Sequence, residues 1–393
     1  MGDAAAGEGA FMVTAAPAPP LPADADPGDA DPAADPAVRD RPRPSVRGLG
    51  PNWYATVMGT AIVATAGAGL PVDVPGLPGV CRMVWGLSVL LLGAVLAARA
   101  AHWARHRDRA RADLLDPAVA PFHGCLPMAL SAVGAATLSV GAEVIGVRAA
   151  VAVDATLWTA GTLLALLTAA GIPALMVLRH RIGPRDASPV WLLPVVAPMV
   201  SAATGPALVP HLPPGQGREA LLLGCLALAG VSLLGTFLML PLIFDRLVRH
   251  GPLPAVLTPA LFLVLGPLGQ STTAAGGLAD AAAYTAGVPE AAARFASVAY
   301  GVPVMGFALL WLASAVALVV RAARGGMPFA MTWWGFTFPV GTCVTGAAAL
   351  SRHTGLHALG WLAVALYGAL VAAWTLVAAR TALGLARGTL LTP

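Results

Sequence analysis

The residues with the most distinctive chemistry lie in the stretch 333–346, which reads WWGFTFPVGTCVTG. At helical spacing Phe338, Thr342 and Thr345 share one face. Pro339 removes a backbone donor and leaves a carbonyl one turn earlier without its usual partner, which is tolerated at membrane depth where the segment faces protein or water. Hydroxyl and carbonyl oxygens hold an ion weakly. This face therefore predicts the lining of an ion pathway, with the ring of Phe338 across it.

Four other apolar segments carry hydroxyl, amide or small residues at helical spacing. The most polar is 266–273, GPLGQSTT, where four hydrogen-bonding side chains follow one another. Since they cannot all face one way, we expect Gln270 and Thr273 on the pathway and Ser271 or Thr272 in packing contacts. Small residues also serve close helix packing, but five such stripes on alternate segments favour a shared pathway. The predicted lining residues are Thr56, Thr60, Ser131, Ser201, Thr204, Gln270, Thr273, Thr342 and Thr345.

The sequence contains no arrangement typical of an enzyme. Outside the first 47 residues, the acidic residues, Asp154 among them, and the histidines fall in expected loops or near the ends of apolar segments. Glu143 and His123 are the nearest candidates for a titrating role, although a structural role is favoured for both. No metalloprotease, serine-hydrolase or nucleotide-binding motif occurs. The four cysteines stand far apart, which favours buried thiols and predicts no metal and no cofactor.

The composition, 58% hydrophobic and 11% charged, is that of a polytopic membrane protein, because soluble domains carry roughly a quarter charged residues. Residues 1–47, rich in Ala, Pro, Asp and Gly, are predicted to form a disordered cytoplasmic tail. Residues 48–387 are predicted to form one all-α transmembrane domain of ten segments, each near the roughly 20 residues that a bilayer requires. These segments are 52–71, 83–104, 122–142, 151–178, 190–210, 219–244, 254–278, 294–320, 331–350 and 357–380.

The arginines indicate the orientation of these segments. In the ten-segment scheme, 18 of the 23 basic residues fall on the side of the tail and five on the other side. Because cytoplasmic loops carry the excess of basic residues, both termini are predicted in the cytoplasm and the segments in the inner membrane.

The odd and even segments differ in character. The odd segments carry small or hydroxyl residues at helical spacing, whereas the second segment is apolar all round and the sixth and tenth are similar. The sequence therefore predicts five helical hairpins, with an inner ring of five odd helices around a central pore. Prolines predicted to kink the inner helices are Pro127, Pro194, Pro267 and Pro339.

Three motifs together carry a resemblance to a known family. PNWY at 51–54 leads to VMGT at 57–60, GPLGQS occupies 266–271, and WWGFTFP occupies 333–339. In this order the motifs resemble the tellurite-resistance / C4-dicarboxylate transporter family, which includes the plant slow anion channel, the fungal malate permease and the fungal sulphite exporter. The similarity covers about residues 50–385.

The resemblance implies ten helices as five hairpins around a central anion pore, assembled as a homotrimer. It also implies a phenylalanine on the ninth helix that closes the pore. By its place in the ninth-helix motif that ring corresponds to Phe338, with Phe336 as the alternative. The first span departs from the repeat because it has no proline in its middle.

The sequence thus predicts a membrane channel or transporter for a small anion, such as a C4-dicarboxylate, sulphite or an inorganic anion. One alternative is a proton-coupled exporter of dicarboxylate or sulphite, although charges buried in a span usually mark such sites and none is expected in the middle of a span here. Another is a membrane sensor or scaffold without transport. The expected partners are the anion and the lipid bilayer. No nucleic acid is expected, because the arginines are spread over short loops.

Overall fold

The computed structural model describes residues 46–285 and 289–390, so the predicted disordered tail lies almost entirely outside the described residues. The described residues form helices and no strand, which confirms the all-α prediction. The α-helices are α1 (Tyr54–Ala68), α2 (Leu77–Arg105), α3 (Arg107–Leu115), α4 (Cys125–Ala136), α5 (Ala142–Ile145), α6 (Val147–Leu178), α7 (Leu192–Thr204), α8 (Gln216–His250), α9 (Leu265–Ala282), α10 (Glu290–Arg324), α11 (Phe338–Thr354) and α12 (His357–Ala386).

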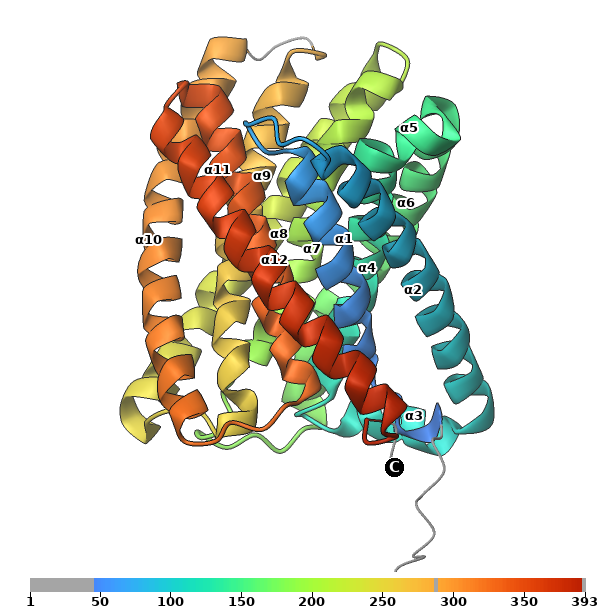
Figure 1. The fold of residues 1–393 in the computed structure, drawn as a ribbon, viewed down its shortest axis with the longest axis vertical. Helices are drawn as coiled ribbons and strands as arrows, with labels where there is room; N and C mark the ends of the chain where they lie inside the picture. Colours follow the sequence, from blue (N-terminus) through green and yellow to red (C-terminus); the bar gives the residue numbers. More distant parts are fainter. Residues whose placement is uncertain (1–45, 286–288, 391–393) are drawn as a thin grey trace, which may run out of the picture. The chain divides into compact units, whose positions relative to one another are not determined.

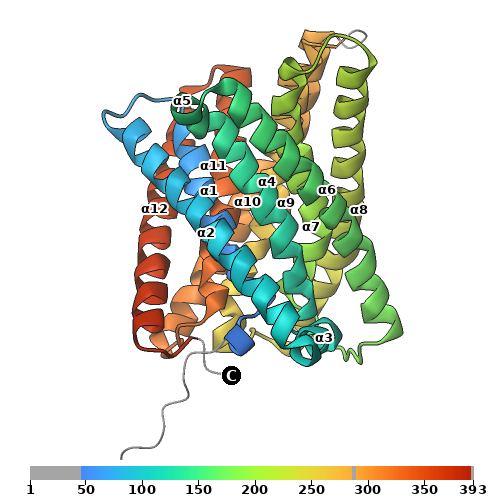
Figure 2. The ribbon, with the colours of Figure 1, turned by 90° about the vertical axis from the view of Figure 1, so that its right-hand side faces the viewer.

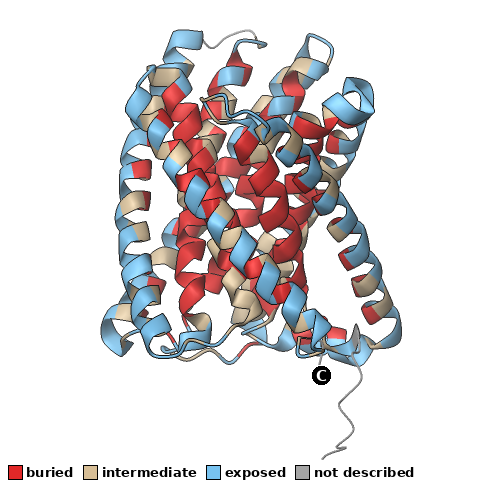
Figure 3. Cartoon of the chain, in the orientation of Figure 1, coloured by how far each residue is buried: buried red, intermediate tan, exposed pale blue. Residues whose placement is uncertain are grey.

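Eight helical stretches of the described residues are long and apolar enough to cross a membrane. In three of them, which contain α4, α7 and α9, 61–83% of the most apolar window is buried within the protein. In the other five, α2, α6, α8, α10 and α12, the buried share is only 17–28%. Helices α1 and α11 have 15 and 17 residues, nearly all buried. Figure 3 shows this division, with buried residues gathered in the interior.

The helices form an inner set (α1, α4, α7, α9 and α11) and an outer set (α2, α6, α8, α10 and α12). Each inner helix packs against the outer helix that follows it along the chain. The inner helices contact one another in the closed order α1, α4, α7, α9, α11 and back to α1 (Figures 1 and 2). The first and last described segments lie at the same end of the bundle (Figure 1).

Each inner helix is preceded by a 3-10 segment. A 3-10 turn is tighter than an α-turn and shifts the hydrogen-bonding partner by one residue. The junction to α-helix therefore leaves some backbone groups without regular partners. These segments are η2 (Pro51–Trp53), η3 (Ala120–Gly124), η5 (Pro189–Trp191), η7 (Ala255–Val264) and η8 (Met331–Phe336).

The four prolines of the predicted kinks lie at these junctions. Pro127, Pro194 and Pro267 are each the third residue of α4, α7 and α9, and Pro339 is the second residue of α11. In the first turn of an α-helix no intrahelical acceptor waits for the missing N–H. The prolines therefore mark where the 3-10 segment becomes α-helix, instead of bending a continuous α-helix in its middle.

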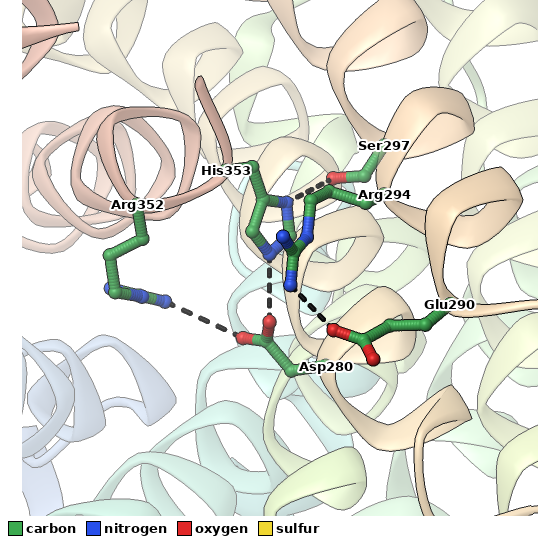
Figure 4. Close-up of polar contacts among 6 residues, drawn as sticks. All are labelled: Asp280, Glu290, Arg294, Ser297, Arg352 and His353. Atoms are coloured by element: carbon green, nitrogen blue, oxygen red, sulfur yellow. Dashed lines mark hydrogen bonds and ion pairs between the residues drawn. The ribbon is translucent and has the colours of Figure 1, made fainter. Parts of the chain in front are cut away.

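A polar cluster joins three helices at the end of the bundle opposite the described chain ends. His353 of α11 contacts Asp280 of α9 through Nε2 at 2.7 Å and Ser297 of α10 through Nδ1 at 3.3 Å. Arg352 lies 3.7 Å from the other carboxylate oxygen of Asp280 (Figure 4). These contacts connect α9, α10 and α11 where the apolar packing ends.

Gly269 provides a test of the close packing between α9 and α11. A Cβ there would lie 2.5 Å from the backbone nitrogen of Cys343, whereas a Cβ at Gly306 on α10 would meet nothing within 4 Å. We expect Gly269→Ala to lower the unfolding temperature in detergent, because overpacking costs about 1–3 kcal/mol. Gly306→Ala is the matched control and should leave it unchanged or slightly raised. Equal unfolding temperatures for the two variants would contradict the close approach.

Candidate functional site

A cavity of about 450 Å³ lies among the inner helices. We call it the central cavity. It extends from Phe338, at the start of α11, to exposed His211, at the end of the 3-10 segment η6 (Gly205–His211). Among the described residues, no Arg, Lys, Asp or Glu lines it. Its polar lining consists of Thr65, Ser139, Thr204, His211, Gln270, Thr273 and Thr345.

Five of the predicted site residues meet at this cavity. They are Phe338 with Thr204, Gln270, Thr273 and Thr345. The hydroxyl oxygens of Thr273 and Thr345 lie 2.7 Å apart and join α9 to α11. The Oε1 atom of Gln270 is buried without a hydrogen-bond partner in the described part of the chain. The hydroxyls and the amide N–H groups of Gln270 can donate hydrogen bonds to an anion, whereas its Oε1 atom can only accept them.

Thr56 and Thr60 lie on a different face of α1. They line a separate lateral cavity of about 420 Å³ between α1, α2 and α12. Thr56 donates to the carbonyl of Trp53 at 2.8 Å, and Thr60 accepts a hydrogen bond from the indole of Trp374 at 3.1 Å. Their hydroxyls therefore serve contacts within α1 and with an outer helix.

Three further predicted lining residues also lie between helices, away from the central cavity. Ser131 of α4 faces Gly161 of α6, where a Cβ would lie 2.7 Å from its hydroxyl oxygen. Ser201 is fully buried within α7, away from the cavity lining. Thr342 donates to the carbonyl of Pro339 at 2.7 Å and is fully buried between α11 and α9.

Phe336, the alternative to Phe338, belongs to η8 and packs against other rings. Its centroid lies 4.9 Å from that of Phe262 and 5.8 Å from that of Trp333. Phe338 lines the central cavity and is 3% exposed. Phe338 also lines a void of about 10 Å³ on the other side, towards the start of the inner helices. It is the one residue common to the linings of these two spaces.

Sequence reasoning missed the apolar part of the lining, which includes Ile62, Ala132, Ala135, Val200 and Ala203. Alanine and valine carry no polar signal that distinguishes a cavity face from a packing face. The prolines do carry a signal. Residues 132, 200, 273 and 345 follow the proline of their own element by five or six positions and all line the cavity.

Asp154 corrects the expectation that carboxyl groups lie near span ends. Helix α6 begins at Val147, earlier than expected, so Asp154 lies two turns inside it. The side chain is 1% exposed, and neither carboxylate oxygen has a hydrogen-bond partner among the described residues. It faces α4 at Gly134, where a Cβ would lie 2.5 Å from Oδ1. An acidic residue inside a membrane helix calls for a functional explanation.

Glu143 and His123, the two residues expected as nearest to a titrating role, have structural partners. Glu143 accepts a hydrogen bond from Arg82 at 2.5 Å, and both side chains are exposed. His123 contacts the carbonyl of Ala120 through Nδ1 at 3.0 Å within η3. Neither lines the central cavity.

An all-helical protein with apolar helices around an uncharged internal cavity has the construction of a membrane channel or transporter. The profile of the voltage-dependent anion channel family (SLAC1) matches residues 48–382, and the chain belongs to this family. This confirms the resemblance and the prediction of an anion channel or transporter that is not an enzyme.

Named relatives agree with this membership. An uncharacterized transporter of Methanocaldococcus jannaschii is 24% identical over 337 residues, covering 86% of this chain and 93% of the relative. Sulfite efflux pumps of Arthroderma otae and Trichophyton rubrum are each 26% identical over 310 residues, covering 77% of this chain and 82% of each pump.

Cysteine labelling tests which face of α7 lines the cavity. We expect Ala203→Cys to react with a small water-soluble thiol reagent, because Ala203 lines the central cavity. Ala197→Cys is the control on the same helix, since Ala197 is 1% exposed and does not line it. The four native cysteines are buried, as predicted, and should give little background. Similar labelling rates at both positions would contradict the assigned face.

Proposed function

We propose that the protein lets a small anion cross the membrane through the central cavity, and that the ring of Phe338 closes this path. The observation that carries the proposal is the position of Phe338 between the central cavity and the small void. A bulky apolar ring at such a point resists an ion because the ion would have to lose water there. Pro339 follows directly in the first turn of α11 and restricts the backbone beside the ring.

The polar groups in the cavity lining support weak binding of the anion. Gln270, Thr273 and Thr345 offer amide and hydroxyl groups in the same lining as Phe338. With no Arg, Lys, Asp or Glu in the described lining, these contacts hold an ion loosely enough to release it, which suits conduction. Sulphite, C4-dicarboxylates and inorganic anions all remain substrates to test. The names of the fungal relatives make sulphite the first choice.

The proposal includes ten membrane spans arranged as five hairpins. With the 3-10 segments that precede them, α1 and α11 reach 18 and 24 residues, Pro51–Ala68 and 331–354. The closed contact order of the inner helices supports a ring around the path. The surplus of arginine on one side supports cytoplasmic termini in the inner membrane. Assembly as a homotrimer rests on the family resemblance.

Replacement of Phe338 tests the closing ring. We expect Phe338→Ala to raise anion flux into liposomes, by about tenfold if the ring contributes a barrier of about 1.4 kcal/mol. Phe336→Ala is the matched control, because Phe336 packs against Phe262 and Trp333 away from the path. Sulphite and chloride flux would be measured for both variants. Unchanged flux in Phe338→Ala, with measurable flux in the wild type, would contradict the role of the ring.

A second candidate function, proton-coupled export, is favoured by Asp154. Burying an ionised carboxylate without a partner is costly. A neutral, protonated Asp154 avoids this penalty, and a residue that gains and loses a proton inside the membrane is suited to coupling.

The coupled mechanism predicts that a pH gradient drives anion flux in the wild type. Asp154→Asn keeps the shape of the side chain but cannot bind or release a proton, so it should retain flux and lose the response to the gradient. Liposomes with an imposed pH gradient provide the measurement, and Glu143→Gln is the control at an exposed acid. If wild-type flux ignores the gradient, coupling is excluded and conduction remains.

A further inference from the structure

We propose a second barrier in the same path, an apolar collar formed by Met58 of α1, Met128 of α4, Leu193 of α7 and Leu263 of η7. This inference rests on the proposed path through the central cavity. The four side chains and Phe338 line the void of about 10 Å³. The four collar residues come from four elements of the inner ring, and Phe338, from the fifth, bounds the void on the side of the central cavity.

The collar lies on the same faces of the helices as the central cavity. Met58 precedes the cavity residue Ile62 by four positions, and Met128 precedes Ala132 by four. Side chains four residues apart in a helix lie one above the other. The collar is therefore the continuation of the cavity towards the start of the inner helices, one turn beyond it.

The collar is closed to a hydrated ion in this structure. A void must offer about 10–15 Å³ to hold a single water molecule, and this one offers about 10 Å³. The four collar side chains are between 1% and 8% exposed. An anion passing here would have to shed its water among methyl and thioether groups, and such constrictions act as barriers even when they are briefly wide enough.

Two features distinguish the collar from ordinary core packing. A Cβ at Gly266, beside the void, would meet its nearest heavy atom, Cγ1 of Val196, only at 4.0 Å. At Gly269, three residues further along α9, the nearest atom would be at 2.5 Å. The space is thus left open specifically beside the void. Methionine side chains are unbranched and flexible, so Met58 and Met128 have more alternative rotamers than a ring or a branched side chain at these positions would have.

Two barriers in series have a characteristic effect on the anion flux of single and double variants. Removal of either one leaves the other to limit the flow, so single variants give limited increases in flux. Removal of both should raise flux by more than the product of the two single effects. A collar that merely fills the core would add nothing to the effect of Phe338→Ala.

The test uses the full chain in liposomes, with sulphite and chloride as the probes. We expect Phe338→Ala/Met128→Ala to exceed the product of its single variants. The control is Phe338→Ala/Met305→Ala, which truncates a methionine that is 2% exposed on α10 and lines neither space. It should behave like Phe338→Ala alone.

A variant that is expected to lower the flux controls for effects of reduced stability. Gly266→Ala adds a methyl group to open space, so it should lower the flux of the Phe338→Ala protein while leaving its unfolding temperature unchanged. If Phe338→Ala raises flux and neither Met128→Ala nor Gly266→Ala changes it further, the collar is overturned and the path stands. If neither the wild type nor any variant passes an anion, the proposed function itself fails.

Discussion

The structure depends on one constraint, the need to satisfy every backbone polar group away from water. An unbroken α-helix meets most of this need within itself. The outer helices α2, α6, α8, α10 and α12 are of this kind, although α6, α8 and α10 each contain one interior proline, Pro173, Pro241 and Pro303. The inner elements are not regular, since each changes from 3-10 to α-helix inside the bundle. Such junctions are tolerated because the outer helices cover them. Removing one outer helix would therefore expose backbone, as well as side chains, to lipid.

The same constraint explains why a hydroxyl on an inner helix does not by itself show that its face lines the central cavity. Thr56, Thr60 and Thr342 each donate to a carbonyl three or four residues earlier in their own segment. A threonine satisfied in this way can face a neighbouring helix as easily as a cavity. Small side chains then decide the geometry, because alanines such as Ala132 and Ala203 leave the space that forms the cavity.

Sequence patterns could predict the features that depend on the composition of a whole segment. Alternation of apolar and hydroxyl-bearing segments predicted which helices are buried, and the motif at 333–339 drew attention to Phe338. The face of each helix depends on a rotation that composition does not encode, which is why Thr60 was expected on the path and Ile62 was not. The position of Asp154 was predicted wrongly because the expected start of its helix was a few residues too late. Helix α6 starts at Val147, four residues before the expected boundary, and this moved one carboxyl group from a span end to the interior.

The distribution of polar groups indicates what limits flow through such a protein. A charged residue in the path would create a deep well, and release from that well would limit the rate. In the described lining the polar groups are hydroxyls, one amide and, at the exposed end, the imidazole of His211, with no Arg, Lys, Asp or Glu, so the well is shallow. In the proposed path, the main resistance then comes from the loss of hydration at apolar side chains. The size and mobility of rings and thioethers, instead of charges, would therefore control the flow. The two kinds of side chain differ here, since Phe338 sits beside the restricted backbone of Pro339, while the unbranched side chains of Met58 and Met128 have more rotatable bonds. If both proposed barriers hold, the ring would set the resting closure and the collar would respond to small movements of the helices.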